Sequence, residues 1–340
     1  MCLVLAWMSC HLNDNPKVKW PMNIAEKIDE LREGISHVLL ERISSNYWLL
    51  EVPFYSNIGD TLIWQGEMDF LKGTGYRCKG MHSLETFRFS HISPNDLILF
   101  QGGGNFGDLW VRHHEFKMRV VEAYPNNEFL FLPQTVYFEN PRNMRECASL
   151  LAGKKATICA RDNASYKTLK ENFNNEVLLV PDMAFCIDMR KWRSSVVPTT
   201  DRHLLLKRED KELKMSEELI RLEAMEEFDT SDWSTFRGDN AVEVQFNRLR
   251  RVVGKPLVRR IPGLESFALG MYMLYKYRPF LISSGITQLS RYSEIYTTRL
   301  HAGILGMLLN KRVRFLDNSY GKNRHFYETW LSDCEDVEFM

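Results

Sequence analysis

An arginine and a histidine two residues apart stand at the start of a predicted helix near the C-terminus. The segment YTTRLHAGILGMLL places Arg299 and His301 in the first turn if the helix begins near Thr298. Cations in a first turn oppose the helix dipole, so the pair favours a bound anion. Arginine matches a phosphate or carboxylate with paired donors, and histidine exchanges a proton near neutral pH. The structural alternative is a histidine whose bonds are satisfied within the core.

A polar loop, DNSYGKN, follows the predicted strand RVRFLD. It brings Asn318, Ser319 and Tyr320 to the same edge of the sheet as the arginine and histidine, and Gly321 permits a turn. Lys322 adds a second positive charge for an anionic ligand. The simpler alternative is an ordinary polar turn.

Residues 102–107 (GGGNFG) satisfy the pattern GxGxxG directly after a predicted strand. A dinucleotide fold needs this motif in its first strand–helix–strand unit and an acid at the end of the following strand. Here Glu122 precedes that strand, which argues against a nicotinamide site. We expect a strand-to-helix turn in which Gly103, Gly104 and Asn105 bind an anion or a sugar hydroxyl. A tight turn without a ligand is the alternative.

A second loop with glycine and polar residues, NIGD, follows the first predicted strand. Asn57 and Asp60 are good helix N-caps, so helix initiation alone would explain them. However, two such loops after parallel strands open on the same edge of a sheet. This convergence favours a binding site.

Alternating strands and helices must position these loops. A leading helix is predicted from Ile24 to about Leu40. Strands are then expected at 47–52 and 96–100 and in EFLFLPQ, ATICARD and EVLLVPD, with helices between them. After a polar linker the pattern resumes with the strand HLLLKRED and a long charged helix, KELKMSEELIRLEAMEEF. In the last hundred residues we expect SFALGMYMLYKY and RLHAGILGMLLN to be helices and FLISS and RVRFLD to be strands.

This alternation predicts an α/β protein with two doubly wound, Rossmann-like domains that face a cleft. The predicted division is an N-terminal helical extension at 1–44, a first domain at 45–190, a linker at 191–202 and a second domain at 203–340. Ligands are expected in the cleft, near the carboxyl ends of the strands.

Composition excludes several classes of protein. The 44 basic and 44 acidic side chains cancel, so binding of nucleic acid by bulk charge is not expected. The seven cysteines are scattered without a CxxC pair, which predicts buried thiols in a reducing compartment. No segment has the roughly 18 apolar residues of a membrane helix. We therefore expect a cytoplasmic protein, and the lack of HxxH or paired DxD motifs predicts no metal requirement.

Taken in order, the motifs NIGD, FQGGGNFGD, LPQT, ARDNAS, VPDMAF, TTRLHAGILGMLL and DNSYGKN resemble the polysaccharide pyruvyl transferase family over about residues 50 to 330. The resemblance implies a GT-B-like fold and transfer of a pyruvyl group from phosphoenolpyruvate to a sugar. The expected setting is synthesis of bacterial exopolysaccharide, capsule or cell-wall polymer. Phosphoenolpyruvate would be the co-substrate, with no cofactor, and the saccharide acceptor would be free or lipid-linked.

The same resemblance assigns roles on the donor side. Arg299 and His301 match the family's Arg-x-His pair, and Arg161 matches an arginine that would hold the donor. Phosphoenolpyruvate is a compact trianion, which these arginines and Lys322 suit. Ketal formation requires protonation of the enol carbon, and His301 is the candidate general acid. Asp182 matches a proline–aspartate motif and either contacts the ligand or braces a loop.

Residues on the N-terminal domain are assigned to the acceptor sugar. Asp60, Asn105 and Gln134 match family positions there. The loops that contain them add Asn57, Gly103 and Gly104 as candidates.

Residues 190–262 match no motif of the family, and they include NRLRRVVGKPLVRR. This stretch has six basic residues without an acid: Arg248, Arg250, Arg251, Lys255, Arg259 and Arg260. A solvated surface is the simpler interpretation. The alternative is contact with anionic lipid headgroups, at the inner face of the membrane, or with the diphosphate of a lipid-linked acceptor.

Two other functions remain open at this point. A GT-B glycosyltransferase that uses a nucleotide sugar would also place a diphosphate at a helix start in the second domain. A non-catalytic member of the family would bind a saccharide without turnover.

Overall fold

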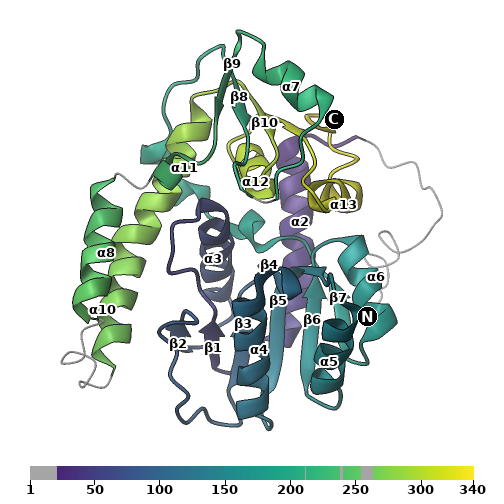
Figure 1. Cartoon of the computed structure of the whole chain (residues 1–340), viewed down its shortest axis with the longest axis vertical. Helices are drawn as coiled ribbons and strands as arrows, with labels where there is room; N and C mark the ends of the chain where they lie inside the picture. The colour runs from purple at the N-terminus through teal and green to yellow at the C-terminus, as the bar shows by residue number, and fades with distance from the viewer. Residues whose placement is uncertain (1–20, 211, 238–239, 254–262) are drawn as a thin grey trace.

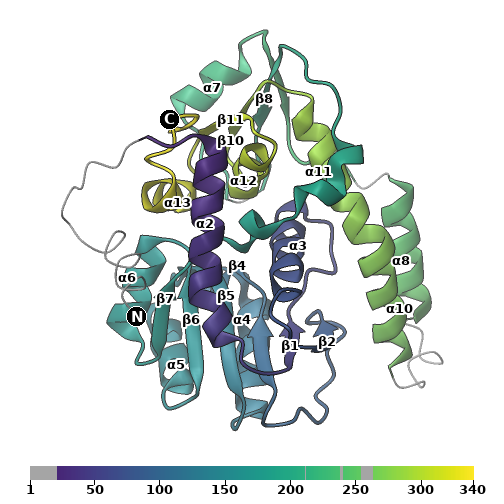
Figure 2. The same ribbon diagram turned by 180° about the vertical axis from the view of Figure 1, so that it is seen from behind.

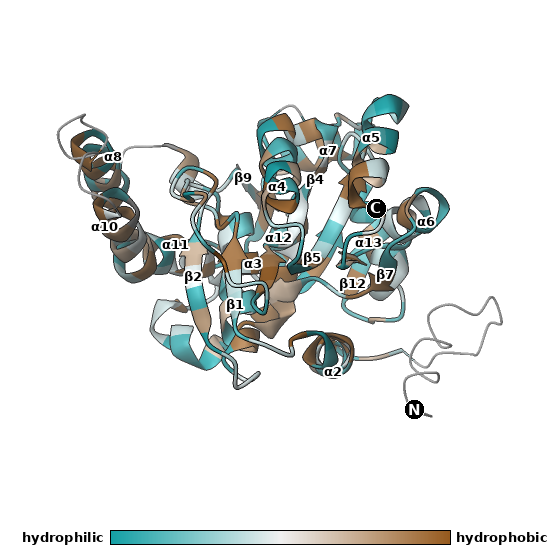
Figure 3. Ribbon diagram, turned by 90° about the horizontal axis from the view of Figure 1, so that it is seen from below, coloured by the Kyte–Doolittle hydropathy of each residue, from teal (hydrophilic) through white to brown (hydrophobic). Residues whose placement is uncertain are grey.

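The computed structural model describes residues 21–210, 212–237, 240–253 and 263–340. These residues form two halves, each built on a parallel sheet with helices packed against it (Figure 1). The predicted α/β class with two Rossmann-like sheets is confirmed. One hydrophobic cluster of buried side chains runs through both halves. Helix α3 is predominantly apolar (Figure 3) and packs against helices of the second half.

The first sheet has the order β2-β1-β3-β5-β6-β7, with β4 beside β5, and its pairs are parallel. Its strands are β1 (Tyr47–Leu50), β2 (Cys78–His82), β3 (Leu97–Phe100), β4 (Gly103–Gly107), β5 (Glu128–Tyr137), β6 (Ala156–Ala160) and β7 (Glu176–Leu179). The connecting helices are α3 (Ile58–Leu71), η2 (Asp108–Trp110), α4 (Val111–Ala123), α5 (Pro141–Leu151) and α6 (Asn163–Asn172). Helices cover both faces, so the central strands are apolar throughout.

The second sheet has the order β12-β11-β10-β8-β9 and is also parallel. Its strands are β8 (His203–Leu206), β9 (Phe228–Ser231), β10 (Glu294–Thr297), β11 (Arg312–Phe315) and β12 (Val337–Phe339). Its helices are α7 (Glu217–Glu223), η5 (Ser234–Arg237), α8 (Ala241–Val253), α10 (Leu264–Tyr272), the π-helical η6 (Met273–Tyr277), α11 (Arg278–Ser290), α12 (Leu300–Leu308) and α13 (Lys322–Trp330).

Helix α2 (Ile24–Leu39) runs along both halves (Figure 2). It begins with a capping box in which Asn23 and Glu26 exchange hydrogen bonds. The buried Lys27 pairs with Asp333 at 2.7 Å, and Arg32 donates to the carbonyl oxygen of Phe185 at 2.7 Å. The leading helix therefore connects the second half to the segment that leaves the first. Short helices η1 (Leu40–Arg42), η3 (Met183–Cys186) and η4 (Met189–Ser195) complete the two connections.

The glycine-rich segment differs from its prediction. Residues 103–107 form strand β4 beside the second half of β5, where a strand-to-helix turn was expected. Gly103 and Gly107 have φ angles of 132° and 122°, and a Cβ on Gly107 would lie 1.8 Å from the carbonyl oxygen of Tyr137. Glycine is therefore required for the pairing with β5, and several amides expected to be free are used in the sheet.

Two further elements differ in type or length. The run FLISS lies inside helix α11, and the strand of this region is β10, EIYT. A short apolar run fits either a buried strand or a buried helix, and here it continues the helix that starts with α10. The charged segment predicted as one long helix forms only α7, which Ser216 caps, followed by strand β9. Among the helices that the structure describes, none is long and apolar enough to cross a bilayer.

Candidate active site

The two sheets reverse their strand order at points that open on one cavity. In the first sheet the chain leaves β1 toward β2 on one side and β3 on the other, and in the second sheet the reversal lies between β8 and β10. Open parallel sheets bind ligands outside the carboxyl ends of their strands at such points. A cavity of about 380 Å³ is lined by residues that follow β1 and β3 and by residues that follow β8 and β10.

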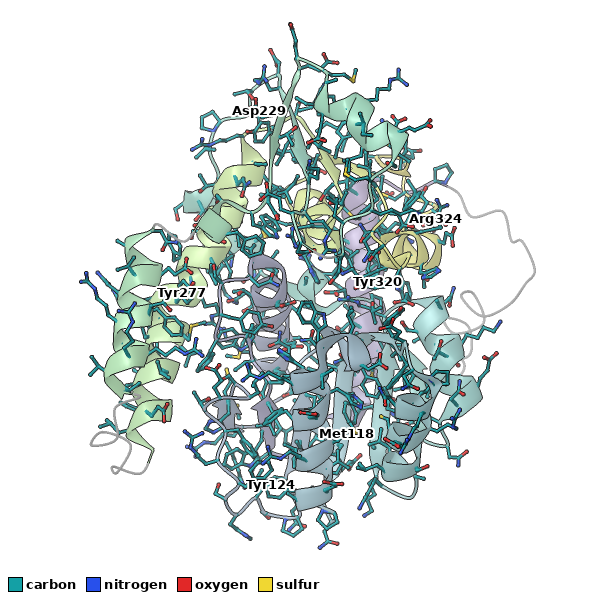
Figure 4. The ribbon with its side chains drawn as sticks, in the orientation of Figure 1. Met118, Tyr124, Asp229, Tyr277, Tyr320 and Arg324 are labelled. Atoms are coloured by element: carbon teal, nitrogen blue, oxygen red, sulfur yellow. The ribbon has the colours of Figure 1, made fainter. Side chains whose placement is uncertain are left out.

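Most of the predicted site residues line this cavity. They are Asn57, Asp60, Gly104, Asn105, Arg161, Arg299, His301, Tyr320 and Lys322. Tyr320 lies between the two halves in Figure 4. The predicted residues therefore lie on both walls of one cavity.

The structure places the other predicted residues outside the cavity lining. Gln134 is fully buried and donates to the carbonyl oxygen of Gln101 at 2.6 Å, so it supports the segment after β3. Asn318 is also buried, and its Oδ1 accepts from the backbone N–H of Lys322 at 2.8 Å. Ser319 is exposed, and Gly103 pairs with β5. Gln134 and Asn318 thus act on the site through the backbone that they hold.

Arg299 is held in one orientation by an acidic partner. It occupies the N-cap of α12, and its Nε and Nη2 lie 2.5 Å and 2.6 Å from the two carboxylate oxygens of Asp232. The guanidinium also lies 5.0 Å from the ring centroid of Phe236. Paired, charge-assisted bonds of this kind fix the plane of the guanidinium. These bonds use Nε and Nη2, and Arg299 also lines the cavity.

His301 reaches from the second half to the first. Its Nε2 lies 3.4 Å from Oδ2 of Asp182 and 3.5 Å from Nη1 of Arg161. On its other side the ring packs on the first turn of α3, because a Cβ on Gly59 would lie 2.8 Å from Nδ1. The imidazole is therefore clamped between the loop after β7 and the start of α3.

A buried ion pair supports this histidine. Arg161 and Asp182 are both 1% exposed and pair at 2.7 Å, and Nε of Arg161 donates to Thr135. Burial alone would raise the pKa of Asp182, but His301 and Arg161 outweigh it and hold that pKa below its ordinary value. Asp182 also accepts from the backbone N–H of Ala184, so it braces the loop as well as contacting His301.

A second charged cluster was missed by the sequence analysis. Arg208 follows β8 and lies 2.6 Å from Glu212, which also lies 3.1 Å from Lys322 and accepts from Tyr320. Burial acts to raise the pKa of Glu212, and Lys322 and Arg208 lower it to about 2. The signal was present as the charged run KRED after the strand HLLL, at the reversal point of the second sheet.

The wall from the first half presents a carboxylate with oriented partners. Asn57 caps α3, and its side-chain amide donates to Asp60 at 2.8 Å. The hydroxyl of Tyr55 donates to the same oxygen of Asp60 at 2.9 Å. Burial is the largest cause that raises the pKa of Tyr55 well above its ordinary value, and the neighbouring Asp60 raises it further. Tyr55 therefore stays a hydrogen-bond donor.

Beside this wall lies a histidine that no sequence motif indicated. His113 lines the cavity, and its Nδ1 is 2.8 Å from Glu51. Glu51 is buried, has a φ of 71° and also pairs with the buried Lys117 at 2.7 Å. A non-glycine residue in this backbone region is uncommon and marks a strained position. Lys117 in turn donates to the carbonyl oxygen of Asn105, which fixes the end of the glycine-rich segment.

The basic segment is only partly described. Arg248, Arg250 and Arg251 are exposed on α8, and Arg250 pairs with Glu85 of the first half at 2.5 Å. Lys255, Arg259 and Arg260 lie outside the described residues.

The polysaccharide pyruvyl transferase model matches residues 57–320, so the chain belongs to this family. This membership makes the chain a transferase and supports a role in pyruvyl transfer during polysaccharide synthesis. The match spans both walls of the cavity.

Individual relatives cover most of the chain. "Putative pyruvyl transferase EpsO" of Bacillus subtilis (strain 168) is 32% identical over 298 residues, which is 85% of this chain and 87% of that protein. "Pyruvyl transferase 1" of Schizosaccharomyces pombe is 27% identical over 301 residues, 84% of this chain and 70% of that protein. A crystal structure of a functionally uncharacterised protein from Klebsiella pneumoniae has a TM-score of 0.59 at 19% identity and covers 91% of this chain and 98% of its own. That likeness supports the fold.

Proposed function

We propose that this protein transfers the pyruvyl group of phosphoenolpyruvate to a pair of sugar hydroxyls, forming a pyruvate ketal during polysaccharide synthesis. The observation that carries the proposal is the grouping of Arg161, Arg299, His301 and Lys322 on one cavity in a member of this family. The proposed reaction uses phosphoenolpyruvate as co-substrate and no separate cofactor or metal.

The donor would bind against the cations of the second half. Arg299 and Lys322 are each held by a carboxylate, Asp232 and Glu212, so their side chains need little reordering when an anion binds. The first turn of α12 adds backbone amides and a favourable dipole. The carboxylates offset much of the positive charge of the site, so specificity would depend on oriented donors more than on net charge.

The proposed chemistry begins at the methylene carbon of the donor. His301 gives a proton to that carbon, which becomes a methyl group and leaves an oxocarbenium-like centre. One sugar hydroxyl adds to this centre and loses its proton, and the C–O bond to phosphate breaks with release of inorganic phosphate. A second hydroxyl then adds and loses its proton to close the ketal. The acceptor gains pyruvic acid less one water.

The acceptor would bind against the first half. Asp60 accepts from Tyr55 and Asn57 and can accept a further bond from a sugar hydroxyl. Asn105 and Gly104 add polar groups at the same wall. With this division, the reacting carbon would lie between His301 and the sugar.

Ligand binding provides the first test. Inorganic phosphate or a nucleotide sugar should stabilise the protein less than phosphoenolpyruvate, because the proposed site matches both a phosphate and a carboxylate. At 100 times its dissociation constant a ligand raises the unfolding free energy by about 2.7 kcal/mol, which a thermal shift detects. Stabilisation by nucleotide sugars alone would favour a glycosyltransferase instead. A saccharide that stabilises the protein without phosphoenolpyruvate binding would favour a non-catalytic member.

We further propose peripheral contact with anionic lipid through the exposed Arg248 and Arg251 of α8, in support of a lipid-linked acceptor at the inner face of the membrane. Sedimentation with phosphatidylglycerol vesicles should capture the wild type. The R248E/R251E variant should stay in solution. Equal capture of both proteins, or capture of neither, would refute the contact.

A further inference from the structure

A second cavity adjoins the candidate active site on the side of the first half. It has a volume of about 520 Å³ and shares Tyr55, Trp110 and His113 with the first cavity. A ligand that extends beyond the first cavity past these three side chains would enter the second. None of the motifs described above assigns a function to the second cavity.

The inner surface of this second cavity is largely apolar. Val52 and Phe54, which follow β1, are buried, and Leu84 is half-buried. At its mouth Trp110 and Val111 are 39% and 54% exposed, side by side at the start of α4. Large apolar side chains exposed next to a cavity are typical of a binding surface.

The rim of the second cavity is charged, and both halves contribute to it. Arg112 comes from α4, and Arg250 comes from α8 of the second half. Arg250 pairs with Glu85 on the rim at 2.5 Å, and nearby Arg88 pairs with Glu265 of α10 at 2.9 Å. Helices α8 and α10 form an arm beside the β2 edge of the first sheet (Figure 1), and α10 contacts β2. The arm therefore closes one side of this cavity.

We propose that the second cavity is a subsite for the sugar unit next to the one that receives the pyruvyl group, so that the acceptor is an oligosaccharide of at least two units. The inference rests on the proposed function. A sugar ring presents C–H groups on its faces and hydroxyls at its edge, which matches an apolar floor inside a charged rim. The acyl or alkyl chain of a lipid would match the floor but would leave Glu85 and Arg112 facing an apolar ligand.

Acceptor length provides the test. Initial rates with phosphoenolpyruvate would be measured for a panel of methyl glycosides, their disaccharides and their octyl glycosides. We expect kcat/KM to be about 10-fold or more higher for the best disaccharide than for the matching methyl glycoside. In the L84W and V111W variants, each of which enlarges a side chain on the cavity lining, this ratio should fall to about one. Each variant is first checked for an unchanged thermal unfolding temperature and an unchanged shift with phosphoenolpyruvate.

A matched control and an independent measurement separate the outcomes. The I220W variant introduces the same side chain at a 56% exposed position on α7, away from the cavity, and should keep the ratio of the wild type. Ligand-observed NMR without donor would compare the binding affinity for the disaccharide with that for the matching methyl glycoside. This ratio of affinities tests the subsite independently of the transfer reaction. A ratio of one in the wild type, or an undiminished ratio in both filled variants, overturns the subsite. Preference for the octyl glycoside overturns it in favour of an apolar aglycone. Lack of phosphate release with every sugar counts against the proposed function instead.

Discussion

The Nε2 atom of His301 lies 3.4 Å from Oδ2 of Asp182, and this contact joins the start of α12 in the second half to the loop after β7 in the first. The same Asp182 is paired with the buried Arg161. One carboxylate therefore orients a proposed general acid and a proposed donor-binding cation. The geometry of the site depends on how the two halves are docked.

Removal of this histidine should impair turnover while leaving the fold intact. We expect H301A to lower kcat by about 10²- to 10⁴-fold, the usual contribution of a positioned acid or base. Steady-state rates of phosphate release provide the measurement. H91A, at an exposed loop position, is the control and should behave as wild type. Near wild-type turnover by H301A would show that another group donates the proton.

Replacement of the carboxylate partner should also cost stability. In D182N the guanidinium of Arg161 stays buried without its counter-charge, which typically costs about 3–5 kcal/mol. Urea unfolding at neutral pH measures this loss. An exposed pair of the same type, Arg312 with Asp336, supplies the comparison, and D336N should change stability by less than about 1 kcal/mol. Equal losses in the two variants would mean that Asp182 has no special role in the fold.

A conservative change at Arg299 should weaken donor binding although the charge is kept. Lysine cannot make the paired bonds to Asp232, so R299K loses the fixed orientation of the cation. We expect the affinity for phosphoenolpyruvate to fall by about 10-fold or more, as a charge-assisted bond is lost. Calorimetric titration with phosphoenolpyruvate measures this affinity. R324K changes an exposed arginine and should leave the affinity for phosphoenolpyruvate unchanged. If R299K bound phosphoenolpyruvate as tightly as R324K does, this result would contradict the proposed donor site.

Glu212 should make the protein sensitive to acid. Its pKa is about 2 in the folded protein, compared with an ordinary value of 4.5, so the carboxylate binds a proton more readily in the unfolded chain. The resulting stabilisation is fully present above about pH 4.5 and is lost as the pH falls toward 2. By the conversion of 1.36 kcal/mol per unit it is on the order of 3 kcal/mol. Unfolding free energies from pH 3 to 7 should show a steeper acid loss for the wild type than for E212Q, and parallel curves would exclude this role.

A buried acid under the segment after β3 should behave as a neutral group. Burial raises the pKa of Glu67 well above its ordinary value, and Oε1 accepts from the backbone N–H of Gly102 at 2.7 Å. We expect E67Q to keep that bond and most of the stability. E67A should lose about 1–3 kcal/mol because the N–H of Gly102 loses its partner. Urea unfolding of both variants tests this, and a larger loss in E67Q than in E67A would show that the carboxyl is ionised.

The sequence predicted both sheets and about half of the residues that line the cavity, because strand-to-loop junctions carry strong local signals. Asn57, Arg299 and Lys322 all stand at helix starts, where capping residues and motif order coincide. The pairing of β4 with β5 could not be predicted, because it depends on close backbone contact between Gly107 and Tyr137. Local patterns do not report such contacts.

Residues that act through distant partners were the hardest to predict. Arg208 and Glu212 belong to the cavity only because β8 lies beside β10 in the second sheet, which the motifs did not specify. His113 depends on Glu51, whose left-handed backbone conformation has no signal in the run YWLLEV. Asn318 was expected to contact the ligand, but it is buried and holds the backbone of Lys322.

Turnover of phosphoenolpyruvate in the presence of sugars tests the central claim most directly. The protein would be incubated with phosphoenolpyruvate and a panel of galactosides, glucosides, mannosides and N-acetylhexosaminides, with phosphate release and product mass recorded together. We predict that one acceptor gains the mass of pyruvic acid less one water for each phosphate released, and that the rates of both signals fall by about 10²- to 10⁴-fold in H301A. Phosphate release without a modified sugar, or transfer of a sugar from a nucleotide donor in the same assay, would contradict it.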